Sequence, residues 1–118
     1  MNIFSFDSQH GTPIHEFDSH GASAQELGHG TGEAHAFVMR FERGGLIGPH
    51  PAGFGQLLLP VQGAGWIAGA DGARHALRPG EAAFISKGEI HSKGSDQGMT
   101  AVMVQIREFT PNVLRPAV

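Results

Sequence analysis

Glycine-marked turns recur along most of this chain, and they limit how long any regular element can be. Glycine accounts for 18 of the 118 residues, or about twice its usual share in globular proteins. From residue 34 onward, turn signals separate apolar or alternating segments at intervals of about 8 to 12 residues. Helix-forming stretches are sparse. The pattern predicts an all-β fold, either an antiparallel sandwich or a small barrel that encloses side chains or one ligand.

About eight short strands are expected. Residues 34–42 alternate in the manner of a strand. Residues 55–63 form another, in which Pro60 predicts an edge position or a bulge. The dipeptide Asp71-Gly72 is a strong hairpin signal. Further strands are expected in the segments 81–86, 90–94 and 99–109.

The two ends of the chain are patterned more weakly. Residues 1–33 are expected to form N-terminal edge strands and loops, with one helical turn in 23–30 that ends at Gly28. Residues 110–118 carry two prolines and are expected to form a tail. With 118 residues, the chain has the length of one domain with a real core. We therefore expect a single domain over residues 1–118.

Composition and charge exclude several classes of protein. The net charge is −3 and no basic block exceeds two residues, so no nucleic-acid partner is expected. The absence of cysteine excludes disulfides, thiolate nucleophiles and cysteine-based zinc sites. Neither a signal peptide nor the ~20 apolar residues of a membrane helix is found. These features predict a cytoplasmic protein that does not contact a membrane.

Two glycine-histidine segments carry the main functional signal. In the first, Gly44 is followed after five residues by His50, then by Ala52, Gln56 and, after six more residues, Gly63. The imidazole of His50 and the amide of Gln56 therefore stand between two turn glycines. The segment contains no carboxylate.

The second segment runs from Gly80 through Ser86 and Gly88 to His91 and Ser95. Together the two segments resemble the paired motifs of the cupin superfamily, G-x5-H-x-H-x(3,4)-E-x6-G and G-x5-P-x-G-x2-H-x3-N. The resemblance covers roughly residues 34–108 and implies a cupin-type jelly-roll barrel, also called a double-stranded β-helix. Serines replace the proline and asparagine of the second motif.

The resemblance also implies a metal site. In cupins, histidines and a glutamate from the first motif and a histidine from the second hold a divalent metal inside the barrel. Carried over to this chain, the ligands would be His50, Gln56 and His91, and the metal Fe, Mn, Ni or Zn. Ala52 stands where a further histidine is expected and cannot bind a metal. Because this set has no negative charge, a bound metal would favour an anionic ligand.

Three further residues are candidates for a substrate pocket. Phe54 is expected at the pocket rim, and Trp66 at the barrel mouth, where its ring could stack on a ligand. His35 begins the strand 34–42 and would add a nitrogen if it points inward. Each also has a simpler interpretation, which is core packing for the two aromatic residues and solvent exposure for His35.

Three functional hypotheses follow. The leading one is a small metal-dependent cupin enzyme that acts on a small anionic metabolite, such as a sugar acid or a keto acid. The alternatives are a metal-free small-molecule binding module and a purely structural dimer. Whether the chain catalyses a reaction is left open. The two-sided apolar strand at 34–42 and the low share of charged residues, 16%, predict a homodimer.

Overall fold

The computed structural model describes residues 1–6 and 11–112, and these residues form two main β-sheets. The first sheet has the strand order β1 (Asn2–Ser5), β9 (Glu81–Ile85), β6 (Gly55–Gly63), β11 (Met99–Pro111) and β4 (Gly28–Phe41). The second has the order β5 (Gly45–Pro51), β10 (Ile90–Ser95), β7 (Gly65–Ala68) and β8 (Arg74–Leu77). The prediction of an all-β fold is confirmed.

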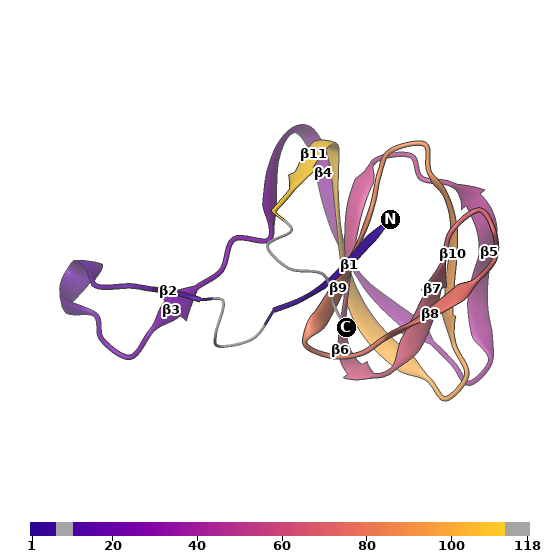
Figure 1. The fold of residues 1–118 in the computed structure, drawn as a ribbon, viewed down its shortest axis with the longest axis horizontal. Coiled ribbons are helices and arrows are strands. Elements are labelled where there is room, and N and C mark those ends of the chain that lie inside the picture. The colour runs from indigo at the N-terminus through magenta and orange to yellow at the C-terminus, as the bar shows by residue number, and fades with distance from the viewer. Residues whose placement is uncertain (7–10, 113–118) are drawn as a thin grey trace.

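The two sheets face each other across one core (Figure 1). Alternation along each strand sends every second side chain into this space. Leu58 and Ile85 from the five-stranded sheet meet Ile67 and Leu77 from the four-stranded sheet, and all four side chains are fully buried. A second cluster on the outer side of the larger sheet includes Phe4, Leu57 and Phe84.

Strands β4 and β11 are longer than the sequence predicted. They pair from Met99 opposite Phe41 to Pro111 opposite Gly28, so β4 begins six residues before the expected strand and β11 runs into the predicted tail. The glycines explain the extension, since a Cβ atom at Gly30 would lie only 2.3 Å from the carbonyl oxygen of Glu108. The rest of the predicted tail, residues 113–118, lies outside the described residues.

The predicted helical turn at 23–30 is wrong. Ser23–Ala24 forms β3, which pairs with β2 (Thr12–Pro13), and Gly28 already belongs to β4. The one helical element among the described residues is a 3-10 turn, Glu16–Asp18, at the tip of this small hairpin. None of the helical structure described is long and apolar enough to cross a membrane.

Two local predictions from turn and strand chemistry are confirmed. Asp71-Gly72 lies in the turn between β7 and β8, where Gly72 has a φ of 76° and the carboxylate of Asp71 accepts from the N–H of Ala73 at 2.9 Å. Pro60 lies beside a bulge, because the register of β6 against β11 shifts between Thr100 and Ala101. A bulge tolerates the missing N–H of proline.

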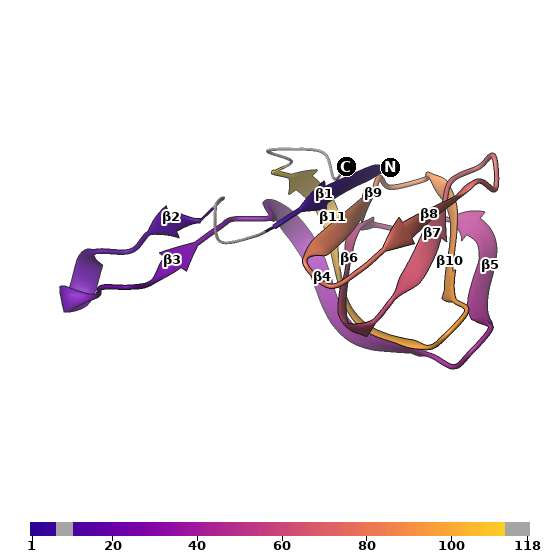
Figure 2. The same ribbon diagram turned by 60° about the horizontal axis from the view of Figure 1, so that its bottom comes forward.

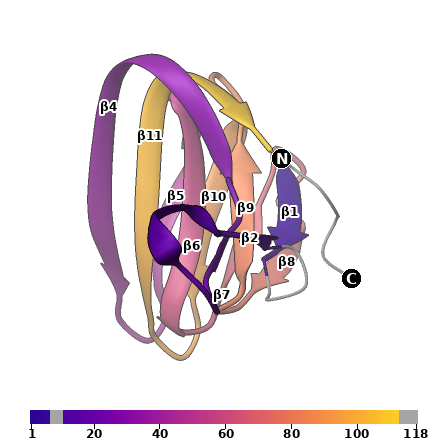
Figure 3. The ribbon, with the colours of Figure 1, turned by 90° about the vertical axis from the view of Figure 1, so that its left-hand side faces the viewer.

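The hairpin of β2 and β3 forms an arm that extends from the barrel (Figures 1 and 2). It projects on the side of the five-stranded sheet, and Figure 3 looks at the molecule from that side. Phe17 at the tip of the arm is 95% exposed. The arm therefore presents a large apolar side chain to the surroundings, away from both apolar clusters of the barrel.

Candidate functional site

His50 and His91 meet inside the barrel. They lie in β5 and β10, which are antiparallel, and the register places the two residues opposite each other. Directly paired residues share one face of a sheet. Their ring centroids are 4.5 Å apart and His91 is fully buried. The two motif histidines, which are 41 positions apart in the sequence, thus converge as the motif spacing predicted.

A lysine that the sequence analysis did not single out completes the centre. Lys93 follows His91 by two residues, so it points to the same face of β10, and it is only 2% exposed. Its Nζ donates to Oε1 of Gln56 at 2.9 Å and lies 3.2 Å from Nε2 of His91. A third contact, of 3.6 Å, reaches the sulfur of Met103. An ammonium has three donors, and all three are directed at neutral acceptors.

The protonation states in this centre follow from burial. Burial, followed by the charge of Lys93, lowers the pKa of His91 to about 4, so its imidazole is neutral at neutral pH. Its Nδ1 lies 3.4 Å from the carbonyl oxygen of Glu89, which leaves the Nε2 lone pair for Lys93. Burial also lowers the pKa of Lys93 to about 8, and the amine therefore remains mainly an ammonium at neutral pH.

The Lys93 ammonium has no carboxylate partner among the residues that the structure describes. Of the two carboxylates nearest to Lys93 in the sequence, Asp96 pairs with Arg74 at 3.7 Å. The other, Glu89, contacts the Met1 ammonium at 2.5 Å and the N–H of Ser86 at 2.9 Å. Burial would raise the pKa of Glu89, but these hydrogen bonds lower it. A buried charge without a counterion is costly. The centre therefore carries a positive charge that no carboxylate of the described residues balances.

The predicted metal ligands come together, but their arrangement does not fit a divalent metal. Oε1 of Gln56 and Nε2 of His91 are both directed at the Lys93 ammonium. Nδ1 of His50 lies 2.8 Å from the carbonyl oxygen of Gly48 and must donate to it, which leaves only its Nε2 free. A metal ion placed here would meet a positive charge at close range. Within residues 1–6 and 11–112, no group of three or more His, Cys, Asp or Glu side chains could hold a metal.

Two of the three predicted pocket residues lie at the rim of this centre. Gln56, Gln105 and His35 are neighbours across β6, β11 and β4, and they share the face that meets Lys93. The ring centroid of His35 is 6.1 Å from that of Phe54. Both side chains are partly exposed. The inward row of polar residues thus leads from the buried lysine to an accessible edge.

Trp66 does not join the other predicted pocket residues. Its neighbour Ile67 belongs to the core, so Trp66 points to the outer face of the four-stranded sheet. There the guanidinium carbon of Arg74 lies 3.8 Å from the ring centroid. Trp66, Arg74 and Asp96 help to line a separate surface pocket of about 380 Å³.

The two facing sheets define a cupin-type fold, an all-β double-stranded β-helix. Residues 41–111 match the family described as the AraC-like ligand binding domain, and the chain belongs to this family. No curated protein matches the chain. The family description indicates a small-molecule ligand, in agreement with the sequence-based prediction of a small-molecule partner.

Several solved structures share the fold. A cupin superfamily protein from Desulfitobacterium hafniense DCB-2 is 14% identical with a TM-score of 0.59, and the match covers 92% of this chain and 100% of that chain. An uncharacterized conserved protein with a double-stranded β-helix domain from Klebsiella pneumoniae is 18% identical with a TM-score of 0.56, covering 87% and 90%. A cupin-2 domain protein from Shewanella frigidimarina is 18% identical with a TM-score of 0.55, covering 77% and 85%. At these identities the likeness concerns the fold alone.

Proposed function

We propose that this domain binds a small organic acid inside the barrel, and that Lys93 supplies the positive charge that a metal ion supplies in other cupins. The observation that carries the proposal is the buried ammonium of Lys93, which lacks a carboxylate among the described residues. A ligand carboxylate would provide the missing counterion in a charge-assisted hydrogen bond, which would replace the 3.6 Å contact of the ammonium with the Met103 sulfur. The family match supports a small-molecule ligand.

The neutral imidazoles favour a hydroxy acid within this class. Nδ1 of His50 donates to the carbonyl of Gly48, so its Nε2 offers a lone pair. A ligand hydroxyl beside the carboxylate can donate to that lone pair. A sugar acid satisfies both Lys93 and His50, whereas a simple keto acid has no hydroxyl to donate. The sequence analysis predicted a sugar acid or a keto acid, and of these two classes we therefore favour the sugar acid.

Binding alone, without turnover, is the function that these contacts support. The Glu89 carboxylate, two residues before His91 in the second motif, contacts Met1 and Ser86. The metal-dependent enzyme remains a prediction that requires Lys93 to leave Gln56 Oε1 and His91 Nε2, the two acceptor atoms it now contacts. The cytoplasmic location also stays a prediction.

The anion proposal is tested by isothermal titration of gluconate, with the neutral polyol sorbitol as the matched ligand. The wild-type chain is expected to bind gluconate and not sorbitol. Lys93→Met should weaken binding at least about a hundredfold, because a buried charge-assisted contact is worth roughly 1.5–3 kcal/mol and its loss also leaves the ligand charge unpaired. Lys87→Met, at an exposed lysine, serves as the control and should bind normally. Equal affinity in wild type and Lys93→Met would rule the proposal out.

The metal prediction has its own test. Untagged protein that has been freed of loosely bound metal is expected to contain far less than one metal ion per chain, because the Lys93 ammonium occupies the lone pairs of Gln56 Oε1 and His91 Nε2. The measurement is elemental analysis of the wild type and of His91→Ala. The variant is an essential control, since eight histidines can bind metal unspecifically. Near-stoichiometric metal that disappears in His91→Ala would instead establish the metal centre.

We also propose that the chain forms a homodimer through the outer face of its larger sheet. Five apolar residues lie in paired positions on this outer apolar face: Ala36, Val38, Leu59, Val102 and Val104. Val38 is 54% exposed, although it lies within a long strand. The arm projects on the same side (Figure 3), so a second copy on this face would also meet the arm. Phe17, in the turn Glu16–Asp18 of the arm, is 95% exposed and would add apolar contact.

Light scattering after size-exclusion chromatography tests the dimer. The wild type is expected to have the mass of two chains, and Val38→Lys the mass of one, because the substitution places a charge in the apolar contact. Leu46→Lys is the matched control, since Leu46 is 55% exposed on the other sheet and should leave the dimer intact. A monomeric wild type at high protein concentration would contradict the proposal.

A further inference from the structure

Four residues from three separate segments form a cluster at the rim of the buried centre. This rim cluster consists of Glu33 and His35 from β4, Phe54 from the loop between β5 and β6, and Arg107 from β11. The guanidinium carbon of Arg107 lies 5.8 Å from the Phe54 ring centroid, and the His35 ring lies 6.1 Å from the same ring. Because His35 is in register with Gln105 and Gln56, the cluster continues the polar row that begins at Lys93.

A β-bulge places the charged members of the rim cluster. Ile106 pairs with Ala34, but Glu108 pairs with Thr31, so two residues of β4 lie opposite Arg107 alone. These two are Gly32, which has a φ of 92°, and Glu33. Bulges redirect side chains and are frequent beside binding sites. The bulge between β4 and β11 thus lies at the rim of the site, and β4 is the edge strand of its sheet.

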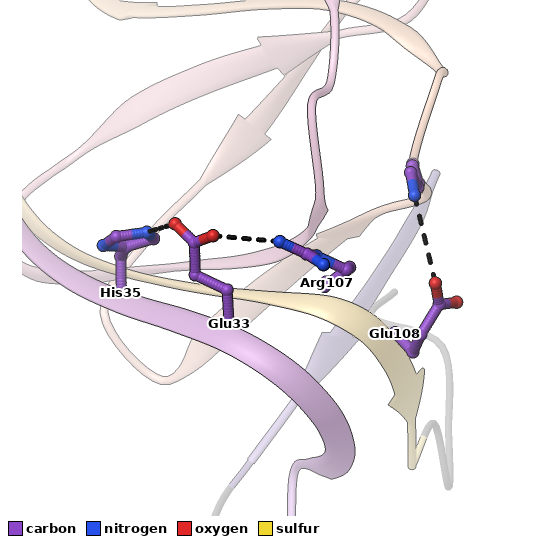
Figure 4. Close-up of polar contacts among 5 residues, drawn as sticks. Glu33, His35, Arg107 and Glu108 are labelled. Carbon is purple, nitrogen blue, oxygen red and sulfur yellow. Dashed lines mark hydrogen bonds and ion pairs between the residues drawn. The ribbon is translucent and has the colours of Figure 1, made fainter.

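Within the rim cluster, Glu33 contacts two side chains, the guanidinium of Arg107 and the imidazole of His35 (Figure 4). Its Oε1 accepts from Nη2 of Arg107 at 3.0 Å, and its Oε2 lies 2.5 Å from Nε2 of His35. The hydrogen bond with His35, followed by smaller contributions that include Arg107, lowers the pKa of Glu33 against the opposing effect of desolvation. The carboxylate is therefore ionised at neutral pH and holds Arg107 in place.

Arg107 retains most of its capacity to bind an anion. A guanidinium has five N–H donors, and the contact with Glu33 engages only Nη2. The side chains of Arg107 and Glu33 are each about half exposed, so solvent reaches the pair and weakens it. The planar fork of a guanidinium matches the two oxygens of a carboxylate. Glu33 thus holds the guanidinium of Arg107 through Nη2, and the remaining N–H donors are available to a ligand.

From this placement we infer that the natural ligand carries two acidic groups, one that binds Lys93 in the interior and one that binds Arg107 at the rim. This inference rests on the proposed anion binding at Lys93 and specifies the chemical class of the ligand as a dicarboxylate or an equivalent two-headed acid. Phe54 lies beside Arg107 and His35, so it would contact the carbon chain between the two acidic groups. Glu33 acts as a positioning residue that holds the guanidinium at the rim.

The test compares dicarboxylates with monocarboxylates of the same chain length: succinate with butyrate, glutarate with valerate, and adipate with hexanoate. Titration calorimetry measures each dissociation constant for the wild type. In the pair whose length matches the site, the dicarboxylate is expected to bind at least about tenfold more tightly, which corresponds to one charge-assisted hydrogen-bonded contact. Arg107→Met should remove this advantage and leave the affinity for the monocarboxylate unchanged. Arg107→Lys, which keeps the charge and loses the fork, should retain part of it.

Control variants separate this inference from the proposal on which it rests. Lys87→Met removes another lysine from the same end of the barrel, one that pairs with Glu108 at 3.9 Å, and it should keep the full dicarboxylate advantage. If monocarboxylates bind in a Lys93-dependent manner but no dicarboxylate binds better, or if Arg107→Met keeps the advantage, the two-headed ligand is wrong and the anion site stands. If the wild type binds gluconate but none of these dicarboxylates, the two-headed ligand is likewise wrong and the anion site stands. If the wild type binds neither gluconate nor these acids, or if Lys93→Met binds them equally well, the anion site itself fails.

Discussion

Replacing Lys93 with methionine is expected to raise the free energy of unfolding near neutral pH by about 3 kcal/mol at most. The pKa of Lys93 is lowered from 10.5 to about 8, because burial disfavours its charged form. Each pKa unit corresponds to about 1.4 kcal/mol. The unfolded chain binds the proton more tightly than the folded chain, so the protonated lysine opposes folding. Methionine has a similar length and no charge, and it removes this cost.

The sign of the effect sets its pH dependence. The cost is fully present below pH 8, where both states carry the proton, and it decreases as the pH rises towards 10.5. Wild-type stability should therefore rise across this interval relative to that of Lys93→Met. Urea unfolding at a series of pH values measures the difference, and Lys87→Met controls for the general effect of losing a lysine. A Lys93→Met variant that is less stable than the wild type at pH 7 would show that the ammonium is not a source of instability.

Acidification is expected to destabilise the protein through His91. Burial lowers the pKa of His91 from 6.5 to about 4. Between these values the unfolded chain takes up a proton that the folded chain excludes, so stability falls as the pH falls. The full shift corresponds to about 3 kcal/mol, which is the largest loss expected over this interval. The lowered pKa values of Glu33 and Glu89 act at lower pH, below their ordinary value of 4.5.

The measurement is the unfolding free energy of wild type and His91→Gln between pH 7 and pH 4. The variant cannot take up a proton at this position, so its stability should change less over the interval. His75→Gln is the matched control, because His75 is exposed on β8 and should keep the wild-type slope. Identical slopes in wild type and His91→Gln would show that another group causes the acid sensitivity.

The sequence predicted the fold class, most of the strands and the meeting of His50 with His91. These features depend on local signals, namely alternation, glycine turns and motif spacing. Such signals do not depend on contacts between distant segments. Lys93 was missed although a signal was present. In a strand that carries an inward His91, the residue two positions further on points inward as well. The lysine was overlooked because lysines are rarely buried.

Other features could not be derived from the sequence, because they depend on contacts between distant segments. Trp66 lies in a short strand with covered residues on both faces, so alternation does not decide which face is the inner one. The decision comes from packing, since a Cβ atom at Gly65 would point at Met99 of the core and Trp66 therefore points outward. The extension of β4 to Gly28 likewise depends on its partner β11. No pattern within either segment contains this information.

The ammonium at the centre of the barrel has a consequence for where and when such a domain can work. Because this positive charge is carried by a side chain, every synthesised copy of the polypeptide contains it. Chelators cannot strip it, and a shortage of trace elements or an exchange for a competing ion cannot alter it. Proton concentration is then the one ionic variable in the surroundings that can change its charge.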